Sequence, residues 1–128
     1  MKNFTLCLFF ISFCSMAGFS GHWESNNESK SLTLDLVEKE NNITGRYCFI
    51  TNNGNRIDCA EDDDININGV TNNNIASVSF ESTFGGVGKA TLSIQDDELK
   101  YTISDNSPFI GANMSVPRVI IFKKTQLK

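Results

Sequence analysis

Residues 47–59, YCFITNNGNRIDC, hold the pattern that decides the fold, because two runs of β-forming residues flank Asn52-Asn53-Gly54-Asn55. An Asn-Gly pair between two such runs is a strong signal for a β-hairpin. In a hairpin centred on this pair, Cys48 lies directly opposite Cys59. A two-residue loop would make the cysteines a hydrogen-bonded pair, whereas a four-residue loop makes them a non-hydrogen-bonded pair. The side chains of a non-hydrogen-bonded pair lie closer together. We therefore favour the four-residue loop and expect a Cys48–Cys59 disulfide, which contributes about 2–3 kcal/mol.

The same two-residue alternation recurs along the chain and predicts strands throughout. Clusters of Asn and Asp separate the runs, and both residues accept left-handed turn geometry. The expected strands lie at 21–25, around 32–36, and at 43–51, 56–60, 64–69, 75–82, 89–94, 98–103 and 116–123. The chain is therefore predicted to be all-β, a single small antiparallel meander of about eight strands that forms either a barrel or a sandwich.

Residues 1–20 predict a secretory signal peptide that is removed from the mature protein. Their one charge is Lys2, which an apolar run from Phe4 to Ile11 follows. Small residues fit cleavage after Ala17 and after Ser20 equally well. We expect residues 21–128 to form a single β domain that is periplasmic or secreted, where a structural disulfide persists.

Charge narrows the classes of partner. Without Lys2 the chain carries ten basic and fifteen acidic residues, a net charge of −5. That balance, with no basic cluster, argues against nucleic acid or an anionic membrane as a partner. No later segment reaches the ~18 apolar residues that a membrane-spanning helix needs, so no membrane insertion is expected. The sequence leaves the oligomeric state open.

No set of residues predicts catalysis, a cofactor or a metal site. His22 is the one histidine and lies beside the expected new terminus, where a rigid catalytic imidazole is hard to hold. Residues 64–69, DINING, match the first half of a calcium loop, but Ile75 replaces the glutamate at position twelve. A weak surface calcium contact at Asp62 and Asp64 stays open. We expect a protein that is not an enzyme and has no cofactor.

A glycine-rich segment predicts a loop that contacts a partner. Its residues are Thr83, Phe84, Gly85, Gly86, Val87 and Gly88. The segment lacks the spacing of a phosphate-binding loop, and its glycines indicate a mobile tip between two strands. Phe84 and Val87 would then be apolar groups offered to a protein partner. The alternative is a glycine-rich bulge that bends a barrel strand while Phe84 packs inside.

The two faces of the hairpin predict a second contact patch. The face that we expect to be the core consists of Cys48, Ile50, Ile57 and Cys59. The face that we expect to be outside consists of Tyr47, Phe49, Arg56 and Asp58. Aromatic residues and arginine are favoured at protein interfaces. These four residues form either a recognition patch or an ordinary half-covered barrel exterior.

Gly21-His22-Trp23, Gly45-Arg46-Tyr47 and a late basic residue resemble the pattern of calycins, the lipocalin and avidin group. In that group a Gly-x-Trp opens the barrel and a late Arg or Lys covers the Trp. Arg118, Lys123 or Lys124 would take that part here. The resemblance implies a barrel that binds a small apolar ligand, although about 108 residues would fill such an interior with side chains.

The overall design is also similar to bacterial periplasmic lysozyme inhibitors and to small immunity proteins that neutralise cell-wall-degrading effectors. The shared features are a signal peptide, one disulfide and a small acidic β-barrel. Such inhibitors carry a Ser-Gly-x-x-Tyr loop, and the nearest segment here, residues 82–86, lacks the tyrosine. This resemblance implies a partner that is a basic lysozyme-like hydrolase, toward which an acidic protein is steered. We therefore expect an exported, non-enzymatic binding protein that inhibits or neutralises such an enzyme. The alternative is a barrel that binds a small apolar ligand.

Overall fold

The computed structural model describes residues 18–125, and within that range it has nine strands and one short α-helix. The strands of the first half are β1 (Gly21–Asn26), β2 (Ser31–Lys39), β3 (Asn42–Thr51), β4 (Arg56–Cys59) and β5 (Ile67–Asn72). The second half holds β6 (Ile75–Glu81), β7 (Val87–Gln95), β8 (Glu98–Asp105), α1 (Ser107–Gly111) and β9 (Val119–Thr125). Residues 1–17, which hold most of the predicted signal peptide, lie outside the described residues. None of the helical residues in the described part forms a segment long and apolar enough to cross a bilayer.

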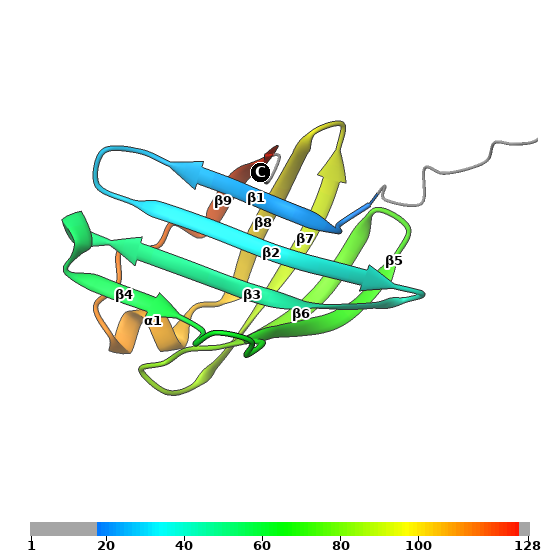
Figure 1. Ribbon diagram of the computed structural model, residues 1–128. Coiled ribbons are helices and arrows are strands. Elements are labelled where there is room, and N and C mark those ends of the chain that lie inside the picture. The colour runs from blue at the N-terminus through cyan, green and yellow to red at the C-terminus, as the bar shows by residue number, and fades with distance from the viewer. Residues whose placement is uncertain (1–17, 126–128) are drawn as a thin grey trace, which may run out of the picture.

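Eight of the strands close into an antiparallel barrel, which decides between the barrel and the sandwich (Figure 1). Neighbours in the ring are neighbours in the chain, except that β3 pairs with β5 and that β1 pairs with β9. The β1–β9 pairing, which sets Trp23 opposite Lys124, joins the two ends of the meander. Strand β4 stays outside the ring and pairs with the second half of β3. The all-β prediction is confirmed.

The turns follow the Asn and Asp clusters of the sequence. Asn53, Asn73 and Asp96 all have φ near +60°, the left-handed conformation that these residues tolerate. Two strands lie about three residues later than predicted, β5 at Ile67–Asn72 and β9 at Val119–Thr125. Helix α1 was not predicted, because five residues are too few to show a 3.6-residue period.

The β3–β4 hairpin has the predicted register and disulfide. Cys48 pairs with Cys59 across the ladder, and Thr51 pairs with Arg56, which leaves the four residues between them as the loop. The two cysteines are bonded, and their Cα atoms are 4.0 Å apart. Such a close approach is typical of a non-hydrogen-bonded pair. Both the four-residue loop and the Cys48–Cys59 disulfide are confirmed.

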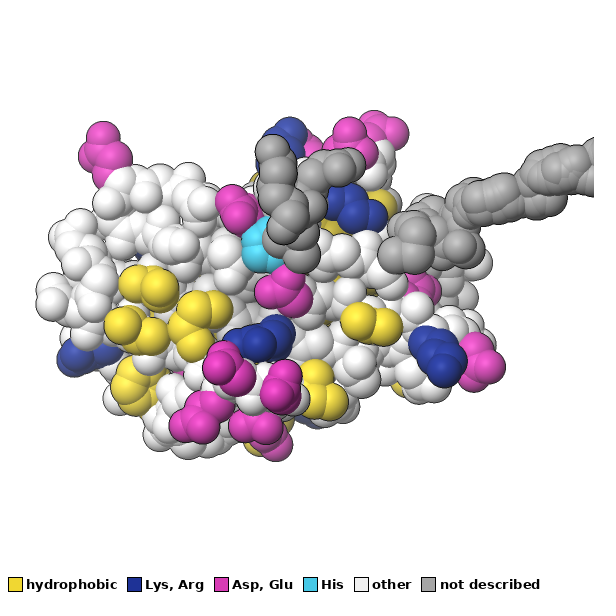
Figure 2. Space-filling view, in the orientation of Figure 1, with side chains coloured by type: hydrophobic (Ala, Val, Ile, Leu, Met, Phe, Trp, Pro, Cys, Tyr) yellow, Lys and Arg dark blue, Asp and Glu magenta, His cyan; other side chains and the backbone are white. Residues whose placement is uncertain are grey.

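The assignment of the two hairpin faces was wrong. Tyr47, Phe49 and Asp58 are fully buried, whereas Ile57 is 54% exposed. Figure 2 shows apolar side chains gathered on the outer surface over β3 and β4. Alternation separates two faces, but it does not say which face the barrel encloses. The barrel encloses the face with the two large aromatic rings, which bury more apolar area than the disulfide and the isoleucines would.

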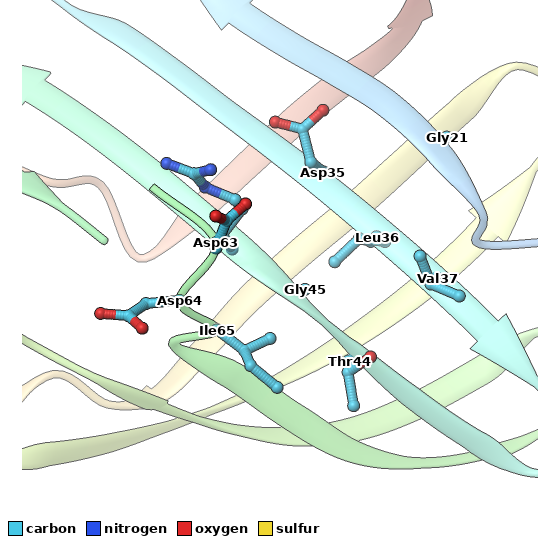
Figure 3. A pocket seen from close by; sticks show the side chains of 10 residues that line it. Gly21, Asp35, Leu36, Val37, Thr44, Gly45, Asp63, Asp64 and Ile65 are labelled. Atoms are coloured by element: carbon cyan, nitrogen blue, oxygen red, sulfur yellow. The ribbon is translucent and has the colours of Figure 1, made fainter. Parts of the chain in front are cut away.

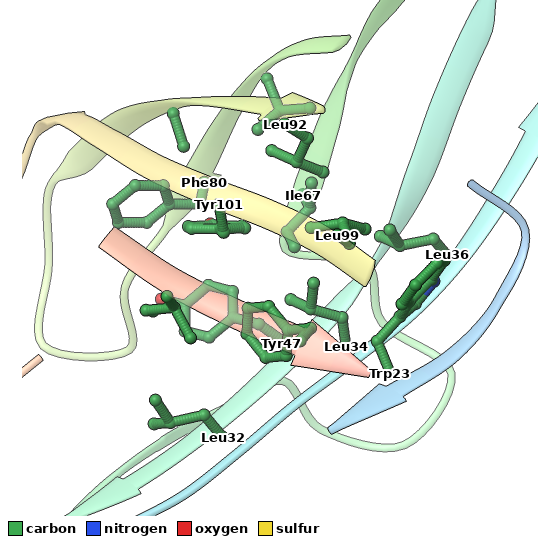
Figure 4. Close-up of a cluster of buried hydrophobic side chains, with 14 of the residues drawn as sticks. Trp23, Leu32, Leu34, Leu36, Tyr47, Ile67, Phe80, Leu92, Leu99 and Tyr101 are labelled. Atoms are coloured by element: carbon green, nitrogen blue, oxygen red, sulfur yellow. The ribbon is translucent and has the colours of Figure 1, made fainter. Parts of the chain in front are cut away.

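Aromatic side chains fill the interior (Figure 4). The ring of Phe49 lies 4.6 Å from that of Tyr47 and 6.1 Å from that of Tyr101, measured between centroids. Helix α1 closes one end of the barrel by inserting Phe109, whose ring stacks on Phe80 at 5.0 Å. The space in which a calycin-type barrel would hold a ligand is thus occupied by the chain's own side chains.

The start of β1 has the arrangement that the calycin resemblance implies. Trp23 is 1% exposed, and the ammonium nitrogen of Lys124 lies 5.3 Å from its ring centroid. A Cβ on Gly21 would lie 2.7 Å from Cε of Lys124, so glycine leaves room for the lysine to reach the ring. Of the three basic residues that were open, Lys124 is therefore the one that lies over Trp23. The architecture is consistent with a calycin-like barrel.

Candidate functional site: the β6–β7 loop and its acidic groove

The loop between β6 and β7 is a tight turn that exposes two apolar side chains. The Ser82 N–H donates to the Gly86 carbonyl at 3.1 Å, and the Gly85 N–H donates back to the Ser82 carbonyl at 3.0 Å. Gly85 and Gly86 have φ of +103° and +96°, which side chains rarely adopt. Phe84 and Val87 are 49% and 51% exposed. Phe84 therefore does not pack inside the barrel, and we call Phe84 and Val87 the apolar tip.

A buried carboxylate holds the base of this loop. Asp58 on β4 is fully buried and accepts hydrogen bonds from the Thr83 N–H at 2.8 Å and the Thr83 hydroxyl at 2.9 Å. The Tyr47 hydroxyl donates to its other oxygen at 2.8 Å. Burial, together with the neighbouring Asp58 charge, raises the pKa of Tyr47 far above its usual value, so the hydroxyl keeps its proton and remains a donor. These bonds fix Thr83, where the predicted contact loop begins.

This network corrects the predicted second contact patch. Its residues were Tyr47, Phe49, Arg56 and Asp58. Three of the four are fully buried and cannot touch a partner. Arg56 is half-buried, and its Nε donates to the Ala112 carbonyl at 3.1 Å. Asp58 was expected on the outer face because a carboxylate is buried only where it accepts hydrogen bonds, and its donors here are distant in sequence.

An acidic groove lies beside the first residues of the loop. It has a volume of about 390 Å³, and Ser82 and Thr83 form part of its wall. The ionisable residues in its lining are all carboxylates, those of Glu61, Asp64 and Glu81. We call this the acidic groove. In the sequence alone, the acidic run at 61–64 suggests only a weak calcium contact at Asp62 and Asp64, because nothing local shows that the run lies beside Glu81 and the loop.

A second groove lies next to the first on the outer face of β2 and β3 (Figure 3). Its volume is about 470 Å³, and it shares Asp64 and Ile65 with the acidic groove. Asp35 and Asp63 add two more carboxylates, and Arg46 is the basic residue in its lining. Figure 2 shows several acidic side chains around a basic one on this face. The surface beside the loop is therefore negative over a wide area.

His22 lies between two carboxylates on the outside of the barrel. Its Nδ1 is 2.5 Å from Asp35 Oδ1, and its Nε2 is 2.9 Å from Glu24 Oε2. Partial burial lowers the pKa of His22, but the hydrogen bonds and charges of Asp35 and Glu24 outweigh it, so the net pKa is raised. Both ring nitrogens are occupied, and the cluster links β1 to β2.

We expect this cluster to make stability depend on pH. Because the folded-state pKa of His22 is raised above 6.5, its contribution is fully present below about pH 6.5 and is lost as the pH rises through the higher folded value. The free energy of unfolding should fall by about 1 kcal/mol or less across that range. Urea unfolding at pH 5.5 and pH 9 measures it. His22→Gln should reduce the difference, and an equal pH dependence in that variant would contradict the assignment.

Within residues 18–125, no three His, Cys, Asp or Glu side chains gather in a way that could hold a metal ion. Compared with protein-family models, curated proteins and solved structures, the chain matches none of them.

Proposed function

We propose that this protein is an exported, non-enzymatic binding protein that inhibits a basic, cell-wall-degrading hydrolase of the lysozyme type. Contact is made by the apolar tip and by the acidic groove beside it. The observation that carries the proposal is their adjacency: Phe84 and Val87 project from a loop whose base, Thr83, forms part of the groove wall.

The apolar tip has the properties of an inhibitory loop. Its two side chains are about half exposed, and exposed apolar groups on a protruding loop often mark a protein contact. The bonds from Thr83 to Asp58 hold the base in one conformation before binding. A loop that is already ordered loses less entropy on association. A narrow tip on a fixed base suits insertion into a substrate cleft.

The acidic groove supplies the charge that a basic partner needs. The groove lining holds three carboxylates and no basic side chain. The chain without Lys2 has a net charge of −5. Complementary charge raises the rate of association and orients the partner. The filled interior favours this proposal over an apolar ligand, because such a ligand would have to displace buried aromatic rings.

The tip can be tested by charge substitution. Phe84→Asp combined with Val87→Asp should reduce inhibition of a basic lysozyme by about 100-fold or more, because the double substitution places two carboxylates in a desolvated contact. The measurement is the rate of peptidoglycan lysis against inhibitor concentration. Val70→Asp with Ile75→Asp is the matched control, since those side chains are 57% and 48% exposed and lie toward the other end of the barrel.

The outcomes separate the parts of the proposal. The control variant should inhibit like the unmodified protein, and both variants should keep its circular dichroism spectrum. Equal inhibition by the tip variant would contradict the loop as the contact. If the unmodified protein inhibits none of a panel of basic lysozyme-like hydrolases, the proposed class of partner is wrong.

A further inference from the structure

Phe19 belongs to the core of the barrel, although it precedes β1. Its side chain is fully buried. Its N–H donates to Glu38 Oε1 at 3.1 Å, and its carbonyl accepts the indole N–H of Trp23 at 3.0 Å. The next residue, Ser20, accepts the Glu38 N–H on its hydroxyl at 2.8 Å. The segment before β1 is therefore bonded to both β1 and β2.

These contacts distinguish the two cleavage positions that the sequence left equal. Cleavage after Ser20 would remove Phe19 and leave an empty volume in the core, which is costly. It would also remove the acceptor of the Trp23 indole N–H, and Trp23 is 1% exposed. A buried donor that loses its partner keeps the full cost of desolvation. Cleavage after Ala17 preserves every one of these contacts.

Gly18 fits the first position of a mature chain. A Cβ added to it would lie 2.5 Å from Glu38 Oε1. Glycine therefore leaves room for this carboxylate. Cleavage before Gly18 would place the terminal ammonium on a residue that lies beside the Glu38 carboxylate, and a nearby opposite charge stabilises the charged terminus.

We infer that the protein is processed between Ala17 and Gly18, so that Gly18-Phe19-Ser20 remains as part of the folded domain. A signal peptidase would hydrolyse this bond by adding one water, which leaves a carboxylate on Ala17 and an ammonium on Gly18. Ser15 and Ala17 supply the small residues that such an enzyme reads before the bond. The inference rests on the predicted signal peptide and is independent of the proposed partner.

The mass of the exported protein tests the position directly. The full chain, expressed in a bacterial host and recovered after export, should have the mass of residues 18–128 with one disulfide. Ala17→Asp should block processing, whereas Ser20→Asp, which keeps an acceptor oxygen for the Glu38 N–H, should be processed normally. A product that begins at Gly21, or one that retains residues 1–17, would overturn the inference.

A second measurement does not depend on the protease. In the mature protein recovered from the same host, Phe19→Ala should lower the melting temperature by about 10 °C or more. If cleavage instead follows Ser20, residue 19 is absent from the mature protein and the substitution changes nothing. An unchanged melting temperature would therefore overturn the inference, even if the mass data were ambiguous.

Discussion

Replacing Phe49 with alanine is expected to lower the free energy of unfolding by about 4 kcal/mol. The ring is fully buried, and its centroid lies between 4.6 and 6.4 Å from the ring centroids of four neighbours, Tyr47, Tyr101, Phe109 and Phe122. Its loss leaves a cavity that this packed cluster cannot close by relaxation. For a domain of this size, such a loss is a large part of the total stability. Urea unfolding of both proteins at one pH measures the difference.

Ile57→Ala is the matched control, because Ile57 lies on the other face of the same hairpin and is 54% exposed. It should cost less than about 1 kcal/mol. The pair of variants reports directly which face of the hairpin the barrel encloses. If Ile57→Ala were the more damaging of the two, the enclosed face would be that of the disulfide.

Asp58→Ala is expected to cost about 3 kcal/mol and to loosen the β6–β7 loop. The substitution removes the acceptor of three hydrogen bonds, those from the Tyr47 hydroxyl and from both donors of Thr83. A buried donor without a partner costs about 1–3 kcal/mol, although Tyr47 also has the Glu81 carbonyl within 3.0 Å. The measurements are urea unfolding and hydrogen exchange of the Thr83 amide, which should become faster.

Asp58→Asn separates the charge of Asp58 from its hydrogen bonds. Its amide oxygen can still accept from Thr83, and its amide group can donate to the Tyr47 oxygen while Tyr47 donates to Glu81. It should therefore cost about 1 kcal/mol and keep most of the protection of the Thr83 amide. Unchanged exchange at Thr83 in the alanine variant would show that Asp58 does not hold the loop.

The local features of the fold could be predicted because their causes are local. The Asn-Gly turn sets the register of the β3–β4 hairpin, and the register brings Cys48 opposite Cys59. Turn residues such as Asn73 and Asp96 mark hairpin ends through their own backbone preference. The exposed Phe84 and Val87 were likewise suggested by the glycines around them, although their role as a contact stays a prediction.

The site as a whole could not be predicted, because distant segments form it. Asp58 and Thr83 are 25 residues apart in sequence, and nothing near either residue indicates the other. The acidic groove likewise brings together Glu61 and Glu81, which are distant in sequence. Even the short helix α1, whose Phe109 plugs the barrel, shows no periodic signal of its own.

The sequence by itself determined an all-β chain, its turns and its disulfide, since each depends on residues within one hairpin. Only the tertiary structure decided that the sheet closes into a barrel through the β1–β9 pairing. It also decided that Phe49 faces inward and Ile57 outward, and that Phe19 belongs to the core. The physical reason is that alternation along a strand defines two faces, whereas the burial of either face depends on the strands that enclose it.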